Sequence, residues 1–275
     1  MNREAVQAVD NKLQVMAAEI LKSKKYNKLG IPSATVLDLL TREITSGNDE
    51  KSALKATRKK MHNLIAPYLG DLNYENSTQL VCDAIQSGGI ENLRAACCQI
   101  LAQHASTRER LPILEIFYDR IFTSTGKPSS ILDLACGLNP LSFPWMGLSE
   151  HVKYHAFDIH QPRIDFINQF FSLMNLQELA KVQDILIEPP TQFADVAFFF
   201  KEAHRMEQRR KGSNRELWQA LKVNYLIVSL PISSLSGRHD LRGQMRRLVH
   251  TTIDEFSWSV EEILFENEMV FCIKK

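Results

Sequence analysis

The second half of the chain alternates short β-rich segments with helical ones, and this pattern constrains the fold more than any other feature. Seven segments are expected to form strands: 131–135, 154–159, 181–186, 196–201, 225–230, 263–266 and 269–273. Helical segments lie between them, most clearly at 163–174 and 216–222. This alternation predicts a parallel sheet with helices on both faces. The last two strands flank a tight turn and must run antiparallel to each other.

The first 124 residues have the apolar spacing of helices. Apolar residues recur on one face in five segments: 5–24, 33–44, 50–65, 76–86 and 91–103. A further helix is expected from Ser106, because Ser106 and Glu109 have the spacing of a capping box. We therefore expect an α/β fold with two parts, a helical N-terminal domain over residues 1–105 and a sheet domain over residues 106–275.

Composition excludes several protein classes. The 275 residues are 44% apolar and 24% charged, as in an ordinary globular protein. Purely apolar runs such as 196–200 are far shorter than the ~20 residues that span a bilayer, which excludes an integral membrane protein. The first residues do not resemble a secretory signal. Five cysteines without a C-x-x-C pair favour free thiols in a reducing cytosol, and the histidine group at 151–160 lacks the spacing of a metal site.

The net charge of +1 conceals two basic regions. Residues 1–66 carry 12 Lys and Arg against 7 Asp and Glu, and residues 201–250 carry 11 against 4. Charge runs are most often solvated faces. Their concentration in two segments nevertheless favours a polyanionic partner such as a nucleic acid.

Acidic residues lie in three successive expected strands, in positions that suit a nucleoside ligand. The segment ILDLACG at 131–137 runs from an apolar strand into a turn of small residues, where a ligand can approach the backbone. It lacks the G-x-G-x-x-G pattern of a dinucleotide site, so a ligand without phosphate, such as S-adenosylmethionine, fits better. Asp158 is placed to accept ribose hydroxyls, and Asp184 is placed to accept the adenine amino group.

Three motifs extend this interpretation: DLACGLNPLSFPWMGL at 133–148, HASTRERL at 104–111 and KKMHN at 59–63. They resemble the aminoglycoside-resistance 16S ribosomal RNA methyltransferases (Arm, Rmt, Sgm and FmrO types), which modify N7 of guanine 1405. The resemblance implies a helical rRNA-docking domain followed along the chain by a domain with the Rossmann-like class I S-adenosylmethionine-dependent methyltransferase fold. It also implies S-adenosylmethionine as the methyl donor, 16S rRNA in the 30S subunit as the partner, and a cytoplasmic monomer that needs no metal.

The resemblance carries cofactor contacts onto residues of both parts of the chain: Tyr68, His104, Ala105, Ser106, Arg110, Ala135, Gly137, Asp158, Asp184, Ile185, Phe200 and Arg209. Arg110 would pair with the methionine carboxylate, and Phe200 would lie beneath the adenine. Lys201 and Arg238 are the expected catalytic residues, near the target nucleotide. Six basic side chains would grip the RNA backbone: Lys22, Lys24, Lys25, Arg58, Lys59 and Lys60. Guanine N7 is an unprotonated acceptor, so its methylation requires alignment and no general base.

Two segments depart from the family pattern on the target side of the site. Where the family reads K-x-L-P-x-L-E-x-Q, residues 201–209 read KEAHRMEQR, so Arg209 replaces a glutamine that helps to bind cofactor. The loop at 237–245 is longer, and His250 lies near an expected tyrosine. Two alternatives to guanine-1405 methylation therefore stay open. One is an rRNA methyltransferase with a different target nucleotide, and the other is a cofactor-binding, ribosome-associated protein with weak catalysis.

Overall fold

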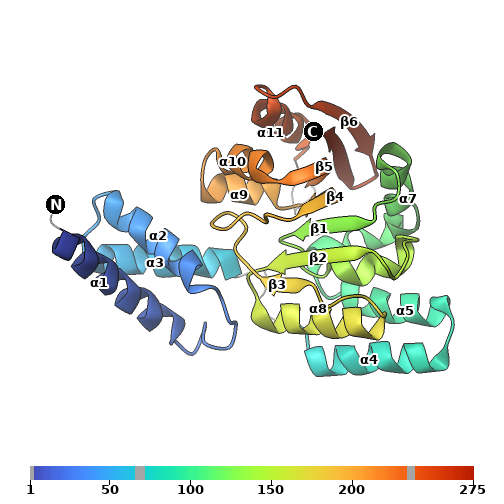
Figure 1. Cartoon of the computed structure of the whole chain (residues 1–275), viewed down its shortest axis with the longest axis horizontal. Helices are drawn as coiled ribbons and strands as arrows, with labels where there is room; N and C mark the ends of the chain where they lie inside the picture. The colour runs from blue at the N-terminus through green and yellow to red at the C-terminus, as the bar shows by residue number, and fades with distance from the viewer. Residues whose placement is uncertain (1–2, 66–71, 234–238) are drawn as a thin grey trace.

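A computed structural model of the chain describes residues 3–65, 72–233 and 239–275 (Figure 1). At its centre is a seven-stranded sheet in the order β3-β2-β1-β4-β5-β7-β6. The strands are β1 (Ser130–Leu134), β2 (Lys153–Asp158), β3 (Ala180–Val182), β4 (Phe193–Phe200), β5 (Lys222–Pro231), β6 (Ser259–Leu264) and β7 (Glu268–Lys274). The first five pair in parallel, and β7 runs antiparallel to β5 and β6. The predicted parallel sheet with a terminal antiparallel hairpin is confirmed.

Helices cover both faces of the sheet because alternate strand residues feed two apolar clusters. One cluster takes Ile131, Val196 and Phe198 together with residues of the helices on the first face. These helices are α4 (Tyr74–Ser87), α5 (Ile90–Leu101), α7 (Leu114–Thr125) and α8 (Gln161–Leu173). The second cluster takes Leu132 and Ala197 with residues from the other face. There the helices are α9 (Ala203–Arg209), α10 (Ser213–Ala220) and α11 (Arg242–Ile253).

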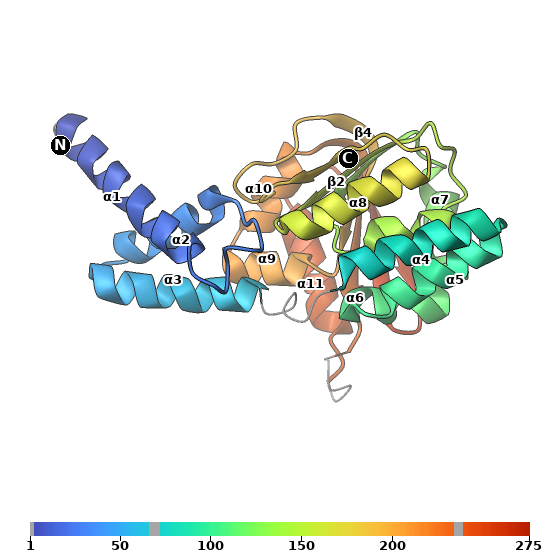
Figure 2. The same cartoon turned by 90° about the horizontal axis from the view of Figure 1, so that it is seen from below.

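The first three helices form a separate unit beside the sheet (Figures 1 and 2). They are α1 (Arg3–Leu21), α2 (Ser33–Thr45) and α3 (Glu50–Ile65), and Ile20, Val36 and Met61 are at the centre of their own small apolar core. Helices α4 and α5 instead pack on α8 and on the 3-10 helix Asn139–Trp145. The domain boundary at residue 105 stays a prediction, although this packing joins α4 and α5 to the sheet rather than to α1–α3.

The expected long helix from Ser106 is interrupted, so that prediction was wrong. Helix α6 (Ala105–Arg108) is only four residues long, and a short 3-10 turn, Leu111–Ile113, separates it from α7. Pro112 lies in this turn and has no N–H to continue a helical ladder. The capping box is absent as well: Ser106 Oγ lies 2.9 Å from His104 Nδ1, and Glu109 pairs with Lys201.

Candidate functional site

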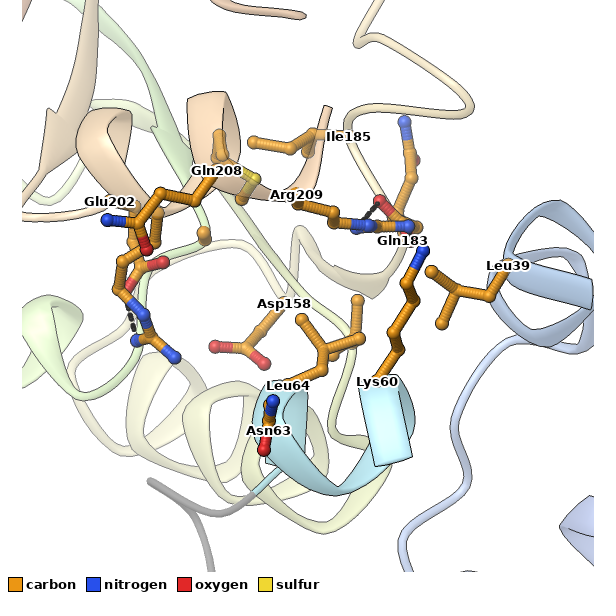
Figure 3. Close-up of a pocket in the computed structure, with 15 residues that line it drawn as sticks. Leu39, Lys60, Asn63, Leu64, Asp158, Gln183, Ile185, Glu202, Gln208 and Arg209 are labelled. Carbon is orange, nitrogen blue, oxygen red and sulfur yellow. Dashed lines mark hydrogen bonds and ion pairs between the residues drawn. The ribbon is translucent and has the colours of Figure 1, made fainter. Parts of the chain in front are cut away.

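The carboxyl ends of the parallel strands border a cavity of about 360 Å³. The strand order reverses beside β1, which pairs with both β2 and β4, and ligands of open α/β sheets bind at such a point. Figure 3 shows side chains from the sheet, from α9 and from α3 gathered around this space. The lining residues are Leu39, Lys60, Asn63, Leu64, Ala135, Asp158, Ile159, Gln183, Asp184, Ile185, Glu202, Arg205, Met206, Gln208 and Arg209.

The turn after β1 brings backbone close to the cavity, as its small residues predict. Ala135 has a φ of 50° and Gly137 a φ of 53°, both in the left-handed region that favours glycine because glycine has no Cβ. A Cβ on residue 137 would meet His104 Cε1 at 3.7 Å. The Gly137 N–H donates to Asp158 Oδ2 over 3.0 Å. The turn is thus fixed to the end of β2, which places the two strand ends at one site.

The buried carboxylate of Asp158 has hydrogen-bond acceptor positions that the described residues do not fill. It is 2% exposed and lines the cavity. Besides the Gly137 bond, its Oδ1 accepts the backbone N–H of His160 over 3.1 Å, and Arg163 Nη1 lies 3.6 Å from Oδ2. A carboxylate has about four acceptor positions. The remaining ones suit a pair of hydroxyls, such as those of a ribose.

Asp184 is also buried, but its carboxylate is fully engaged. Arg209 forms a fork with it, Nη1 to Oδ1 over 2.9 Å and Nη2 to Oδ2 over 2.6 Å. Thr35 Oγ1, from α2, donates to Oδ2 over 2.8 Å. The backbone N–H of Leu186 donates to Oδ1 over 3.2 Å. The helical unit, the sheet and α9 therefore meet at this carboxylate.

Glu202 is the second residue after the end of β4 and faces the same cavity (Figure 3). Burial raises its pKa to about 7, although the neighbouring Arg205 lowers it, and the charge of Asp158 raises it further. Arg205 Nη1 donates to Glu202 Oε1 over 2.8 Å. The sequence indicated Lys201 at this strand end, and it did not single out Glu202.

Beside the cavity, a second group of charges lies at the ends of β4, β5 and β7. Glu268 is completely buried and bonds to Arg110, and Lys201 Nζ lies 3.4 Å from it. Lys201 also pairs with Glu109 over 2.7 Å. Burial raises the pKa of the Glu268 carboxyl, but the charges of Arg110 and Lys201 outweigh it, so that pKa is lowered overall. We call these four residues the charged cluster.

Arg110 is also held by polar and aromatic neighbours. Its Nη1 donates to Asn139 Oδ1 over 2.9 Å, and its guanidinium carbon lies 4.4 Å from the ring centre of Phe117 and 4.5 Å from that of Phe200. Phe200 stacks on Phe198 with ring centres 4.9 Å apart. It does not line the cavity, so its place beneath an adenine stays a prediction.

The structure brings together part of the expected cofactor set. Five of its members line the cavity: Ala135, Asp158, Asp184, Ile185 and Arg209. Five others lie in the charged cluster or in the segments that adjoin it and the cavity: His104, Ser106, Arg110, Gly137 and Phe200. Ala105 is exposed at the start of α6. Tyr68 and Arg238 lie outside the described residues.

Sequence patterns missed the contribution of the helical unit to this cavity. Leu39 comes from α2, and Asn63 and Leu64 come from α3. Lys60, expected to grip RNA, also lines the cavity and pairs with Glu43 over 2.5 Å. Apolar spacing marks Leu64 only as a core residue of α3. Gln183 and Glu202, by contrast, adjoin expected strand ends, and that position could have identified them.

The other expected RNA-contacting side chains are exposed on the helical unit. Lys22, Lys24 and Lys25 follow the end of α1, and Arg58 and Lys59 lie on α3. Lys25 Nζ lies 2.6 Å from His62 Nδ1, and Arg58 lies 3.5 Å from Glu19. Within the described ranges, no group of three or more metal-ligating side chains could hold an ion, and no helix could span a membrane.

Comparisons with known proteins show which family this chain resembles. A family model described as ribosomal RNA methyltransferase (FmrO) matches residues 22–272. A protein of Frankia casuarinae is 31% identical over 98% of this chain and 94% of its own length, and one of Micromonospora echinospora is 30% identical over 98% of each. Both are named 16S rRNA (guanine(1405)-N(7))-methyltransferase. The crystal structure of the 16S rRNA methyltransferase RmtF with S-adenosyl-L-homocysteine is 25% identical, covering 96% of this chain and 98% of that one, with a TM-score of 0.75.

Proposed function

This chain belongs to the ribosomal RNA methyltransferase (FmrO) family, and on that premise we propose that it transfers a methyl group from S-adenosylmethionine to N7 of guanine 1405 in 16S rRNA of the 30S subunit. The observation that carries this proposal is the cavity at the strand ends, where the buried Asp158 carboxylate has acceptor positions left for a ribose. Its size lies within the ~300–1,000 Å³ that small-ligand sites usually have.

The residues around the cavity fit the adenosine part of this cofactor. Leu39, Ile185 and Met206 supply apolar walls, and the left-handed turn at Ala135 and Gly137 allows close approach to the backbone. When bound, S-adenosylmethionine supplies a methyl group activated by a positively charged sulfur. The chain's own task is then to align the guanine with that methyl group and to keep water away, since N7 needs no base.

The charged cluster is proposed to bind the methionine part of the cofactor and to contact the target nucleotide. Arg110 can turn part of its guanidinium fork to a ligand carboxylate while Asn139 and Glu268 keep its position. Lys201, next to Glu202 at the end of β4, is proposed to contact the target nucleotide together with Arg238. Because Lys201 is only 7% exposed and pairs with Glu109, that contact requires the pair with Glu109 to open.

The exposed lysines of the helical unit support docking on ribosomal RNA. Such contacts to phosphates read the shape of folded RNA rather than its sequence. A methyl group at N7 removes an acceptor and adds a positive charge, so the modified subunit is proposed to resist 4,6-linked deoxystreptamine aminoglycosides. We further propose that the protein acts as a monomer in the cytoplasm, in keeping with its five free cysteines.

The test is to map the modification. Purified protein is incubated with 30S subunits and S-adenosylmethionine, and 16S rRNA is cleaved chemically at 7-methylguanine and read by reverse transcription. We expect one new reverse-transcription stop, at guanine 1405, and no new stop when the protein carries Asp158→Ala. A stop at another nucleotide would support the alternative target. Cofactor binding without any stop would support a ribosome-associated protein with weak catalysis.

A further inference from the structure

The Asp184 carboxylate has no acceptor position left for a ligand. Two donors reach each oxygen: Arg209 Nη1 and the Leu186 N–H at Oδ1, and Arg209 Nη2 and Thr35 Oγ1 at Oδ2. A carboxylate accepts about four hydrogen bonds. Asp184 is 4% exposed and Thr35 is completely buried, so water does not compete for them. An adenine amino group can therefore bond to Asp184 only if one of these donors leaves.

Arg209 is the donor that has a second acceptor within reach. The Leu186 N–H belongs to the same loop as Asp184, and Thr35 is buried. Arg209 Nη2, however, lies only 3.8 Å from Oδ2 of a second carboxylate, that of Asp38, which is on α2. Asp38 is partly exposed and is shared with Arg42, four residues along the same helix. Exposed pairs of that kind are weak, so Asp38 can accept a second guanidinium.

Resting on the proposed function, we propose that the adenine amino group displaces Arg209 from Asp184, and that the guanidinium of Arg209 transfers to Asp38. No proton moves, because arginine stays charged throughout. Asp184 exchanges one donor for another, and Arg209 exchanges one carboxylate for another. Arg209 and Asp38 already form a long ion pair of 3.8 Å, and in the cofactor-bound state this pair shortens and joins α9 more firmly to α2 of the helical unit.

This exchange couples the cofactor site to the helical unit. Lys60, Asn63 and Leu64 of α3 already form one wall of the cavity (Figure 3). Arg58 and Lys59 of the same helix are exposed to solvent. A cofactor that strengthens the tie between α9 and α2 favours one placement of this unit. By thermodynamic linkage, a partner that favours the same placement tightens cofactor binding equally.

The test is a double-mutant cycle on binding of S-adenosylhomocysteine, measured by titration calorimetry on the full-length protein. Asp38→Asn removes the receiving carboxylate, so we expect binding to weaken about tenfold. Arg209→Gln frees Asp184, so its binding should be no weaker than that of the unaltered protein. The double variant should then bind like Arg209→Gln alone. Arg215→Gln, which removes an arginine paired with Asp254 and Glu255, is the matched control and should leave affinity unchanged.

A second ligand separates this exchange from a general loss of structure. The analogue with unsubstituted purine as its base carries hydrogen in place of the adenine amino group and has no N–H donor on that edge, so the Asp38→Asn penalty should disappear with it. Equal penalties for the two ligands, additive effects in the cycle, or an affinity of Asp38→Asn equal to that of the unaltered protein would each overturn the exchange. Failure of the unaltered protein to bind S-adenosylhomocysteine would instead overturn the proposed function.

Discussion

Arg110 and Glu268 form an ion pair in which Nη2 lies 2.6 Å from Oε1, with side chains 3% and 0% exposed. Lys201 shares the same carboxylate. Replacing Glu268 with Gln would leave two buried cations facing a neutral amide. We expect the free energy of unfolding to fall by about 3–5 kcal/mol, the usual loss when one partner of a buried pair is removed. Urea denaturation measures it. Glu262→Gln, which breaks the more exposed pair with Arg246, should change stability far less, and equal losses would contradict the prediction.

Asp133 makes stability depend on pH. Burial raises its pKa to about 7, although hydrogen bonds from Asn139 and Tyr154 lower it. The folded state therefore binds a proton more tightly than the unfolded state, whose carboxyl has an ordinary pKa near 3.8. The resulting stabilisation is complete below that ordinary value and is lost as the pH rises through about 7.

Asp133→Asn removes this titration, and its carbonyl oxygen can accept the same two hydrogen bonds. Between pH 5 and 8 the native protein should lose stability relative to this variant, with a slope of at most about 1.4 kcal/mol per pH unit. Urea unfolding of both proteins at a series of pH values measures the difference. A difference that does not vary with pH would show that Asp133 does not titrate in this range.

How much the sequence could predict depended on whether a feature is local. The end of a strand is a local feature, so the position of Asp158 could be predicted from the apolar run that ends beside it. The break at Pro112 is also a local feature, because proline has no N–H to continue a helix, and the sequence alone could have indicated it. The role of Leu64 could not be predicted, because its contact with the cavity depends on how α3 sits against the sheet. The fork between Arg209 and Asp184 joins residues 25 positions apart, and neither shows its partner in the sequence.

Asp158 is the residue on which cofactor binding should depend most. In Asp158→Asn, the amide nitrogen would face a backbone N–H of Gly137 or His160, and the ribose would have one acceptor fewer. We expect affinity for S-adenosylhomocysteine to fall at least about tenfold, since hydrogen bonds to charged groups contribute roughly 1.5–3 kcal/mol. Titration calorimetry measures it.

The matched control for Asp158→Asn is Asp195→Asn. Asp195 accepts the backbone N–H groups of Ser129 and Ser130 at the opposite end of the sheet. Its replacement should leave cofactor affinity unchanged even if it lowers stability. A similar loss of affinity in both variants would mean that Asp158 acts through the fold rather than through the ligand.

Docking on the ribosome should depend on salt through the exposed lysines of the helical unit. Among the described residues, no ion pair engages Lys22, Lys24 or Lys59, so each can neutralise a phosphate. Changing all three to Gln should weaken binding to 30S subunits and flatten the plot of log affinity against log salt concentration, by about 0.7–0.9 for each phosphate that is no longer neutralised. Filter binding at several salt concentrations measures both effects. The control replaces Lys153, Lys222 and Lys274, three exposed lysines at the ends of β2, β5 and β7 that lie away from the cavity. It removes the same charge, so an equal change in slope would mean that net charge, and not the position of these lysines, governs docking.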